Sequence, residues 1–365
     1  MKIIMKNNEL FLIHLYNDYS GSPLVLKNLI NASNEKKFHL FTSRHDGFLS
    51  NLTNCKYVFL SYKYNKNKLI SLIYFIFSQL ELFIKLTVNL LIYRIKGHSC
   101  TVIINTMLPF SASIAGFLFA NRTIYYIHET HIRPNILKKL LLFCISKFSD
   151  EVIYVSKYTK ETLKLKNKNS IIPNPLRNDL TLISNTPPQK KHNRKSVIFC
   201  GSLKEHKGIL NLIKISEKCQ NINFILALNC DKKEFDAFTQ KYSYLNNIES
   251  YHRPNFLGSL YDRSFIVLNL SIPEYSVETF GLSILEGISF GCVPIVPPEG
   301  GPLEIIEPNF GYSIHSNNIE AISDIINELS SDYDQWYTKS ELAIKRSKEF
   351  SFSKYKESIN NILGI

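Results

Sequence analysis

The chain of 365 residues is long enough for two domains of ordinary size, each with its own hydrophobic core. Hydrophobic residues make up 45% of it and charged residues 20%, values that exclude an intrinsically disordered chain. The net charge of +12 lies in the first half, because residues 1–180 carry 24 Lys and Arg against 10 Asp and Glu, and the remaining residues carry 19 against 21. This basic half indicates an anionic partner, either nucleic acid or a membrane with acidic lipids, although a general bias toward Lys and Asn explains the same excess.

The cysteines indicate a reducing compartment. None of the seven forms a CxxC pair, and several lie inside apolar runs, a pattern of buried thiols and not of a disulfide framework or a zinc site. They are Cys55, Cys100, Cys144, Cys200, Cys219, Cys230 and Cys292. Residues 1–20 lack the pattern of a cleaved signal peptide. We therefore expect a cytoplasmic protein.

The first predicted element is a buried strand over residues 9–16, followed by the turn NDYSGSP and a helix from Pro23 to about Ile30. A strand, a glycine turn and a helix start form the first unit of a doubly wound sheet, whose ligands bind beyond the carboxyl ends of the strands. Gly21 is therefore the candidate for close approach of backbone to a ligand. An ordinary turn before a helix explains this glycine equally well.

Residues 68–97 form a long apolar segment that Gln79, Glu81, Lys85 and Asn89 interrupt. No uninterrupted run reaches the roughly 20 apolar residues that a membrane-spanning helix needs. Two interpretations remain open. The segment is either a helix buried between a sheet and its neighbours, or a partly exposed helix lying on a bilayer with its basic ends near lipid phosphates.

Strand-like runs at 101–106, 123–129 and 151–156 alternate with helical segments, the pattern of a parallel sheet. His128 stands at the carboxyl end of the second run, at the edge where α/β proteins build their sites. We expect a first domain over residues 1–180, a linker over 181–196, and a second strand and helix series over 197–350. In that series Lys207 precedes a helix, so its ammonium and the helix N–H groups suit a diphosphate.

Residues 265–306 carry most of the functional signal. An apolar strand, residues 265–271, leads to Glu278 on a loop and to a helix that contains Glu286. The backbone N–H groups of Phe280, Gly281 and Leu282 are expected to be free at the helix start, as a seat for phosphate. Eight residues of helix span about 12 Å, which separates the two carboxylates by the length of an extended ligand such as a nucleotide sugar. Gly300 and Gly301 predict a second close approach of backbone to the ligand.

Three segments resemble one enzyme family. ETFGLSILEG at 278–287, with the GCVPIV and EGGPLE that follow it, is similar to the donor-site signature of the retaining glycosyltransferases of family 4, and FCGSLKEHKG at 199–208 and YYIHETHIRP at 125–134 are similar to other family segments. The resemblance implies the GT-B fold, with two Rossmann-like domains facing each other across a cleft. It also implies a C-terminal helix, residues 351–365, that crosses back to the first domain.

The resemblance assigns roles to residues of this sequence. Glu278, His128 and Lys207 are the expected catalytic residues. The expected donor-binding residues are Glu286, Phe280, Gly281, Leu282, Gly201, Ser202, Gly21 and Gly301. Glu129, His131 and Arg133 are weaker candidates for contacts with the acceptor. The family's phosphate-binding arginine is replaced by Ser202, so Lys204, His206, or Lys207 with backbone alone would hold the diphosphate.

The resulting prediction is a retaining transferase that uses a UDP- or GDP-sugar and neither a metal nor a cofactor, in agreement with the absence of a DxD motif. Its predicted acceptor is a saccharide, lipid-linked in surface polysaccharide assembly of the O-antigen or capsule type, at the inner face of a membrane. Two alternatives remain. One is a GT-B epimerase or hydrolase that uses Glu129 with His131, and the other is a basic nucleic-acid-binding protein, which the lack of a basic aromatic recognition motif disfavours.

Overall fold

The computed structural model describes residues 7–35, 37–63, 65, 67–177, 180 and 186–364. It divides into two compact units, here called unit 1, Met1–Pro173 with Lys356–Ile365, and unit 2, Asn174–Tyr355. Each unit is built on a parallel sheet, as an alternation of apolar strands and helices requires. The predicted fold class of two doubly wound α/β domains is confirmed.

The sheet of unit 1 has the strand order β3-β2-β1-β4-β5-β6-β7, and all its pairings are parallel. Its strands are β1 Asn8–Ile13, β2 Phe38–Ser43, β3 Cys55–Leu60, β4 Ser99–Asn105, β5 Arg122–Ile127, β6 Glu151–Tyr154 and β7 Lys168–Ile171. The central strands are buried on both faces, which is why they are continuous apolar runs and do not alternate. From β1 the chain adds β2 and β3 on one side, and from β4 onward it adds strands on the other side, so the order of strand addition reverses between β1 and β4. This place is called the reversal point of the sheet.

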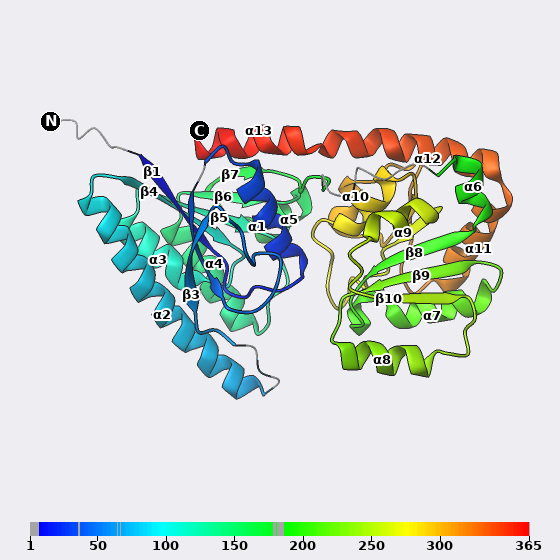
Figure 1. The fold of residues 1–365 in the computed structure, drawn as a ribbon, viewed down its shortest axis with the longest axis horizontal. Coiled ribbons are helices and arrows are strands. Elements are labelled where there is room, and N and C mark those ends of the chain that lie inside the picture. Colours follow the sequence, from blue (N-terminus) through cyan, green and yellow to red (C-terminus); the bar gives the residue numbers. More distant parts are fainter. Residues whose placement is uncertain are drawn as a thin grey trace. The chain divides into compact units, whose positions relative to one another are not determined.

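The helices of unit 1 cover both faces of its sheet. They are α1 Gly21–Ala32, α2 Lys68–Ile95, α3 Phe110–Phe119, α4 Asn135–Phe148 and α5 Lys157–Leu163. Because parallel connections are right-handed, the reversal at β1 and β4 places α1 on one face and α2 to α5 on the other. Figure 1 shows the strands between α1 and α2, and both views show α2 beside α3.

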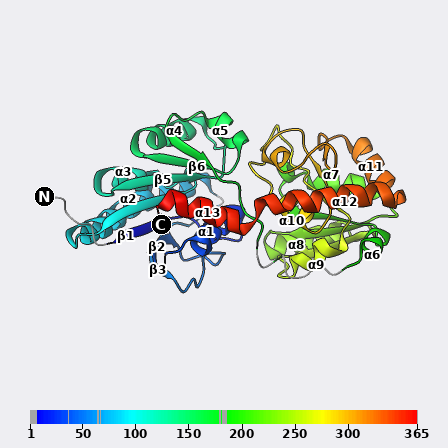
Figure 2. The ribbon, with the colours of Figure 1, turned by 90° about the horizontal axis from the view of Figure 1, so that it is seen from above.

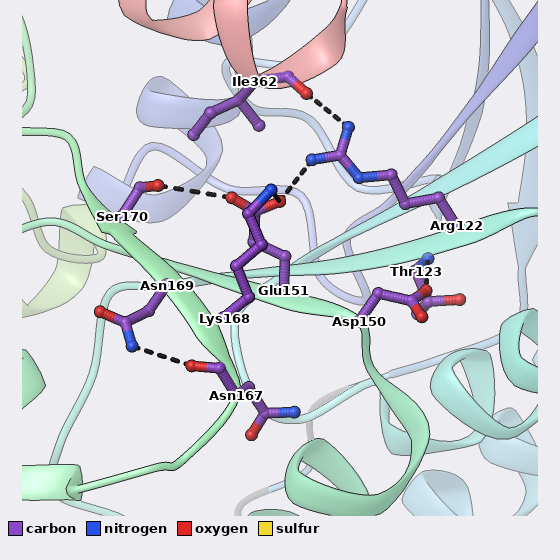
Figure 3. A network of polar contacts seen from close by, with 9 residues as sticks. All are labelled: Arg122, Thr123, Asp150, Glu151, Asn167, Lys168, Asn169, Ser170 and Ile362. Atoms are coloured by element: carbon purple, nitrogen blue, oxygen red, sulfur yellow. Dashed lines mark hydrogen bonds and ion pairs between the residues drawn. The ribbon is translucent and has the colours of Figure 1, made fainter.

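The C-terminal end of the chain belongs to unit 1. Helix α13, Phe352–Leu363, enters this unit at Lys356. The Asn360 side chain accepts a hydrogen bond from the Asn34 N–H at 3.0 Å and donates one to the Ala32 carbonyl at 3.1 Å, so it caps the last turn of α1. Figure 3 shows Arg122 between the buried Glu151 carboxylate and the Ile362 carbonyl, with both of which it is hydrogen-bonded.

Unit 2 has the sheet order β10-β9-β8-β11-β12-β13, again parallel in every pairing. Its strands are β8 Ser196–Gly201, β9 Asn223–Leu228, β10 Ile248–His252, β11 Ile266–Leu268, β12 Val293–Val296 and β13 Tyr312–Ser313. Its helices are α6 Pro188–Asn193, α7 Ile209–Lys218, α8 Lys232–Lys241, α9 Leu257–Arg263, α10 Leu282–Ser289, α11 Ile319–Ser331 and α12 Tyr333–Ser347, with the 3-10 turns η1 Glu205–Lys207, η2 Gly301–Glu304 and η3 Lys348–Phe350. In this sheet the order of strand addition reverses between β8 and β11.

The predicted linker differs from the structure. Residues 181–185 lie outside the described residues, but residues 188–193 form helix α6 within unit 2. Lys191 of this helix is buried, and its ammonium donates hydrogen bonds to the carbonyls of Tyr261, at 3.0 Å, and Phe290. Burial lowers the pKa of Lys191. A segment of linker composition is therefore part of the second core, because one lysine satisfies carbonyls near the ends of two helices.

Candidate functional site

Three polar side chains meet where the direction of the unit 1 sheet reverses. His14 follows β1, Asn105 ends β4, and His128 follows β5. The Asn105 amide nitrogen lies 2.9 Å from His14 Nδ1, and its oxygen lies 2.6 Å from His128 Nε2. Crevices at such reversal points, beyond the carboxyl ends of the strands, are where α/β proteins bind ligands. The cluster includes the predicted His128, and it adds Asn105 and His14.

The Ser22 carbonyl determines the direction of this network. It accepts a hydrogen bond from the Asn105 amide nitrogen at 3.0 Å, and a carbonyl only accepts, so this atom of Asn105 is the NH₂ group. The same group therefore donates to His14 Nδ1, and the opposite oxygen accepts from His128 Nε2. His128 thus carries its proton on Nε2, and His14 carries its proton on Nε2 as well.

Burial keeps both imidazoles neutral. It lowers the pKa of His14 to about 4, and it lowers the pKa of His128 to about 3, with a smaller contribution from His14. At neutral pH these rings act as hydrogen-bonding groups and not as cations. The cluster therefore suits the hydroxyl groups of a sugar better than a phosphate.

Glu129 lies beside the cluster and is held by backbone. Its carboxylate accepts hydrogen bonds from the N–H of Met107 at 2.6 Å and from the N–H of His128 at 3.3 Å. Burial raises the pKa of Glu129 to about 7, so the group changes charge near neutral pH. His131 and Arg133, the other candidates for acceptor contacts, are exposed. The structure therefore brings Glu129, but not His131 or Arg133, to the His128 cluster.

The raised pKa of Glu129 predicts a pH effect on stability. Its folded pKa of about 7 exceeds the ordinary value of 4.5, so its stabilising contribution is complete below pH 4.5 and is lost as the pH rises through 7. Relative to wild type, Glu129→Gln should gain about 2 kcal/mol in free energy of unfolding between pH 5 and pH 8. Urea unfolding at the two pH values measures this, with Glu161→Gln, an exposed position of α5, as control. Equal pH dependence in Glu129→Gln and wild type would contradict the raised pKa of this carboxyl group.

Gly21 is the first residue of α1, next to the Ser22 that fixes the Asn105 amide. Gly21 is exposed, so the start of α1 is open to solvent. A ligand contact at Gly21 stays a prediction.

In unit 2 an ion pair lies at the equivalent reversal point. Lys207 follows β8 in the turn η1, and Glu278 lies on the long loop between β11 and α10. The Lys207 ammonium lies 2.5 Å from Glu278 Oε2, and both side chains are partly exposed. Lys207 holds the pKa of Glu278 below its usual range, so Glu278 is ionised at neutral pH. Lys207 and Glu278, the two predicted catalytic residues of this unit, thus form an ion pair with each other.

Two glycines permit this geometry. Gly208, directly after Lys207, has φ of +76°, and a Cβ there would lie 2.0 Å from the Leu270 carbonyl oxygen. Gly301 donates its N–H to the Glu278 carbonyl at 2.9 Å, and a Cβ there would lie 2.0 Å from the Thr279 oxygen. The structure therefore gives the Gly300 and Gly301 pair a role in packing against the loop that carries Glu278. Contact of this pair with a ligand remains a prediction.

Helix α10 begins at Leu282, four residues after Glu278. Gly281, with φ of +101°, is the N-cap, and Leu282 is the first helical residue. Phe280 is buried, and its ring contacts Phe350 at 6.1 Å between centroids, which anchors the loop to unit 2. The first N–H groups of a helix have no partner within the helix, so this end suits an anion.

Glu286 lies one turn into α10 and is 4% exposed. It accepts a hydrogen bond from the Tyr261 hydroxyl at 3.0 Å, and Arg177 Nη1 lies 3.8 Å from its other oxygen. Neither partner was predicted, because neither lies in a recognisable motif. Gly201 ends β8 and Ser202 follows it, so both lie on the loop that leads to Lys207.

The residues that the structure describes contain no group of three or more His, Cys, Asp or Glu side chains that could hold a metal ion. At the two reversal points the structure brings together an ion pair in unit 2, and neutral imidazoles beside a titrating carboxyl group in unit 1.

The two parallel-sheet units have the fold of the GT-B glycosyltransferase structures. Residues 184–349 match the family model described as glycosyl transferases group 1. The resemblance to this family is confirmed. No curated protein matches the sequence at a significant level.

Solved structures agree in fold over nearly the whole chain. HepE from Anabaena, in complex with UDP and glucose, is similar with a TM-score of 0.79, at 16% identity, over 98% of this chain and 99% of that one. Sucrose-phosphate synthase from Thermosynechococcus elongatus has a TM-score of 0.72, at 15% identity, over 98% of each chain. The lipopolysaccharide outer core galactosyltransferase WaaB has a TM-score of 0.67, at 16% identity, over 98% of this chain and 99% of that one.

Proposed function

We propose that this protein transfers a sugar from a nucleotide-sugar donor, with retention and without a metal, to a saccharide acceptor. The observation that carries the proposal is the pair of Lys207 and Glu278 at the reversal point of the group 1 domain. The chemistry needs positive charge where the diphosphate leaves and negative charge where the sugar becomes cationic. Lys207 supplies the positive charge and Glu278 the negative charge. The structures of HepE with UDP and with UDP-glucose support a UDP-sugar as donor, and a GDP-sugar is the alternative.

The proposed donor arrangement follows the positions of the charged groups in unit 2. The ribose hydroxyls bind Glu286, whose orientation Tyr261 and Arg177 hold. The diphosphate binds Lys207 and the N–H groups at the start of α10. These groups take over the role of the family's phosphate-binding arginine, since this chain has Ser202 at that position. The sugar lies near Glu278. In unit 1 the neutral His128 suits a hydroxyl group of a saccharide substrate. In front-face retention a leaving phosphate oxygen accepts the proton of the acceptor, so Glu278 positions the sugar and is not a nucleophile.

The proposed acceptor is a lipid-linked saccharide of surface polysaccharide assembly, of the O-antigen or capsule type, at the inner face of a cytoplasmic membrane. The excess of basic residues in residues 1–180 supports a lipid-linked substrate with acidic groups. The seven free cysteines support a reducing compartment.

Calorimetric titration with UDP, GDP, ADP, TDP and CMP, without metal, tests the donor site. One nucleotide should bind to wild type, and Glu286→Gln should weaken it about tenfold to a hundredfold, because a hydrogen bond to a charged carboxylate is lost. Glu341→Gln, an exposed glutamate of α12, is the matched control and should bind like wild type. Absence of binding by all five at millimolar concentration would overturn the donor assignment. Donor consumption that does not depend on any acceptor would instead support a hydrolase.

A further inference from the structure

Unit 1 exposes a broad apolar face on three adjacent helices, α2, α3 and α4. Between Leu69 and Ile95 helix α2 is long and apolar enough to span a membrane, yet only 22% of its most apolar window is buried. The outward residues of α2 follow one another at intervals of one, three or four positions, which is a single face of a helix. These are Leu69, Ile73, Ile76, Phe77, Leu80, Ile84, Val88, Leu91 and Ile95, each between 41% and 85% exposed.

From Leu69 to Leu91 this outward stripe of α2 contains no charged side chain, over roughly 35 Å of helix, and Arg94 follows at its end. The two charged side chains in the middle of the helix, Glu81 and Lys85, lie beside the stripe. Glu81 and Lys85 form an ion pair at 2.6 Å and bind the backbone at Ser61 and Phe59, respectively, at the edge of the sheet. A water-facing helix normally carries charges on its outer face, so this outer face is suited to another environment.

The neighbouring helices continue the same surface. α3 adds the exposed Phe117 and Leu118, and α4 adds Ile136, Leu140 and Phe143. Phe148 connects them, because its ring lies 5.5 Å from that of Phe117 and 6.2 Å from that of Phe143. The apolar face, defined as these exposed residues of α2, α3 and α4, therefore spans all three helices.

The charges of these helices are nearly all positive. Their sequences contain the six basic residues Lys68, Lys85, Arg94, Lys138, Lys139 and Lys147 and the single acidic residue Glu81, which pairs with Lys85. Lys139 and Lys147 are exposed among the apolar side chains of α4, and Arg94 is exposed at the end of α2. Apolar side chains bordered by basic ones match a bilayer surface with acidic headgroups.

We propose that the apolar face of α2, α3 and α4 docks unit 1 onto an anionic membrane surface. The outward side chains enter the boundary between headgroups and acyl chains, and the lysines contact lipid phosphates. α2 does not cross the bilayer, because Leu82, Leu86 and Leu90 on its inner side are buried in the core of unit 1. A second copy of the chain fits this face poorly, because its basic residues would lie against identical basic residues.

Flotation with vesicles tests the apolar contribution. Wild type should bind vesicles of equal parts phosphatidylglycerol and phosphatidylcholine, and Ile73→Ser, Phe77→Ser and Ile84→Ser together should weaken binding about tenfold or more. The matched control carries Leu210→Ser, Tyr244→Ser and Phe256→Ser, three similarly exposed apolar positions of unit 2, and should bind like wild type. Loss of binding in both variants, or in neither, would overturn the proposal.

A second set of variants tests the charge and does not disturb apolar packing. Lys138→Glu, Lys139→Glu and Lys147→Glu together should weaken binding to these vesicles about a hundredfold, whereas Lys233→Glu, Lys241→Glu and Lys345→Glu should affect it little. Vesicles of phosphatidylcholine alone should bind wild type weakly. A wild type that ignores both vesicle types but dimerises through α2 would replace the membrane by a second copy. Because no nucleotide is present, the result does not depend on the proposed donor site.

The depth of contact has its own measurement. Tryptophan fluorescence of Phe77→Trp should be quenched by brominated lipids, since interfacial helices insert their apolar face about 5 to 10 Å. Tyr244→Trp, an exposed site of unit 2, should not be quenched. The natural Trp336 is fully buried and contributes a constant background. Equal quenching at both positions would contradict docking through α2.

Discussion

Lys207→Met is expected to lower the rate of sugar transfer about a hundredfold to a thousandfold, the usual loss when one group that stabilises developing negative charge is removed. The ammonium lies 2.5 Å from Glu278 at the reversal point of unit 2, where a leaving diphosphate is proposed to bind. Lys207→Arg should restore part of the rate, because it keeps the charge in a different geometry. The measurement is the turnover of the nucleotide sugar whose nucleotide binds in calorimetry.

A double variant separates catalysis from structure. Removing Lys207 alone leaves Glu278 without its partner, so the free energy of unfolding should fall, and adding Glu278→Gln should recover it. Activity should not recover in Lys207→Met with Glu278→Gln. Lys218 and Glu320 form an ion pair of the same length, 2.5 Å, elsewhere in unit 2, and Lys218→Met should leave turnover unchanged. Parallel recovery of stability and turnover in the double variant would show that the pair is only structural.

Asn105→Leu is expected to destabilise unit 1 by about 2 to 5 kcal/mol, because it leaves a buried acceptor on His14 and a buried donor on His128 without partners. Asn105 is fully buried and joins both rings. Asn105→Asp keeps the shape but places a carboxylate between the imidazoles. It should therefore raise the pKa of both from their low values toward neutrality.

Imidazole NMR resonances followed against pH measure this shift. His252 is an internal control, because it lies in unit 2 and its ring contacts the Cys230 carbonyl at 2.9 Å. Its resonances should not respond to either Asn105 variant. If His14 and His128 titrated identically in wild type and in Asn105→Asp, the hydrogen-bond network would not be the one described. The transfer rate should also fall in Asn105→Asp, since His128 would no longer present the same neutral tautomer.

Most elements were predictable because apolar runs and their lengths reflect local rules. The strand at 9–16, the helix at 68–97 and the helix containing Glu286 all correspond to elements of the structure, β1, α2 and α10. The boundaries were less exact. The strand expected over 265–271 is only Ile266–Leu268, since the chain leaves the sheet early to form the loop that carries Glu278. The linker was missed because the burial of Lys191 depends on distant carbonyls of Tyr261 and Phe290.

The sequence by itself determined the family resemblance, the parallel sheets and the candidates His128, Lys207, Glu278 and Glu286, because these depend on residue types at fixed spacings. Only the tertiary structure decided which groups meet. Glu278 reaches Lys207 across 71 positions of sequence, and Asn105 reaches His14 across 91. It also decided that the outer side of α2 is exposed. Periodicity cannot tell a helix buried on all sides from one with an uncovered face, because that depends on whether another element packs there.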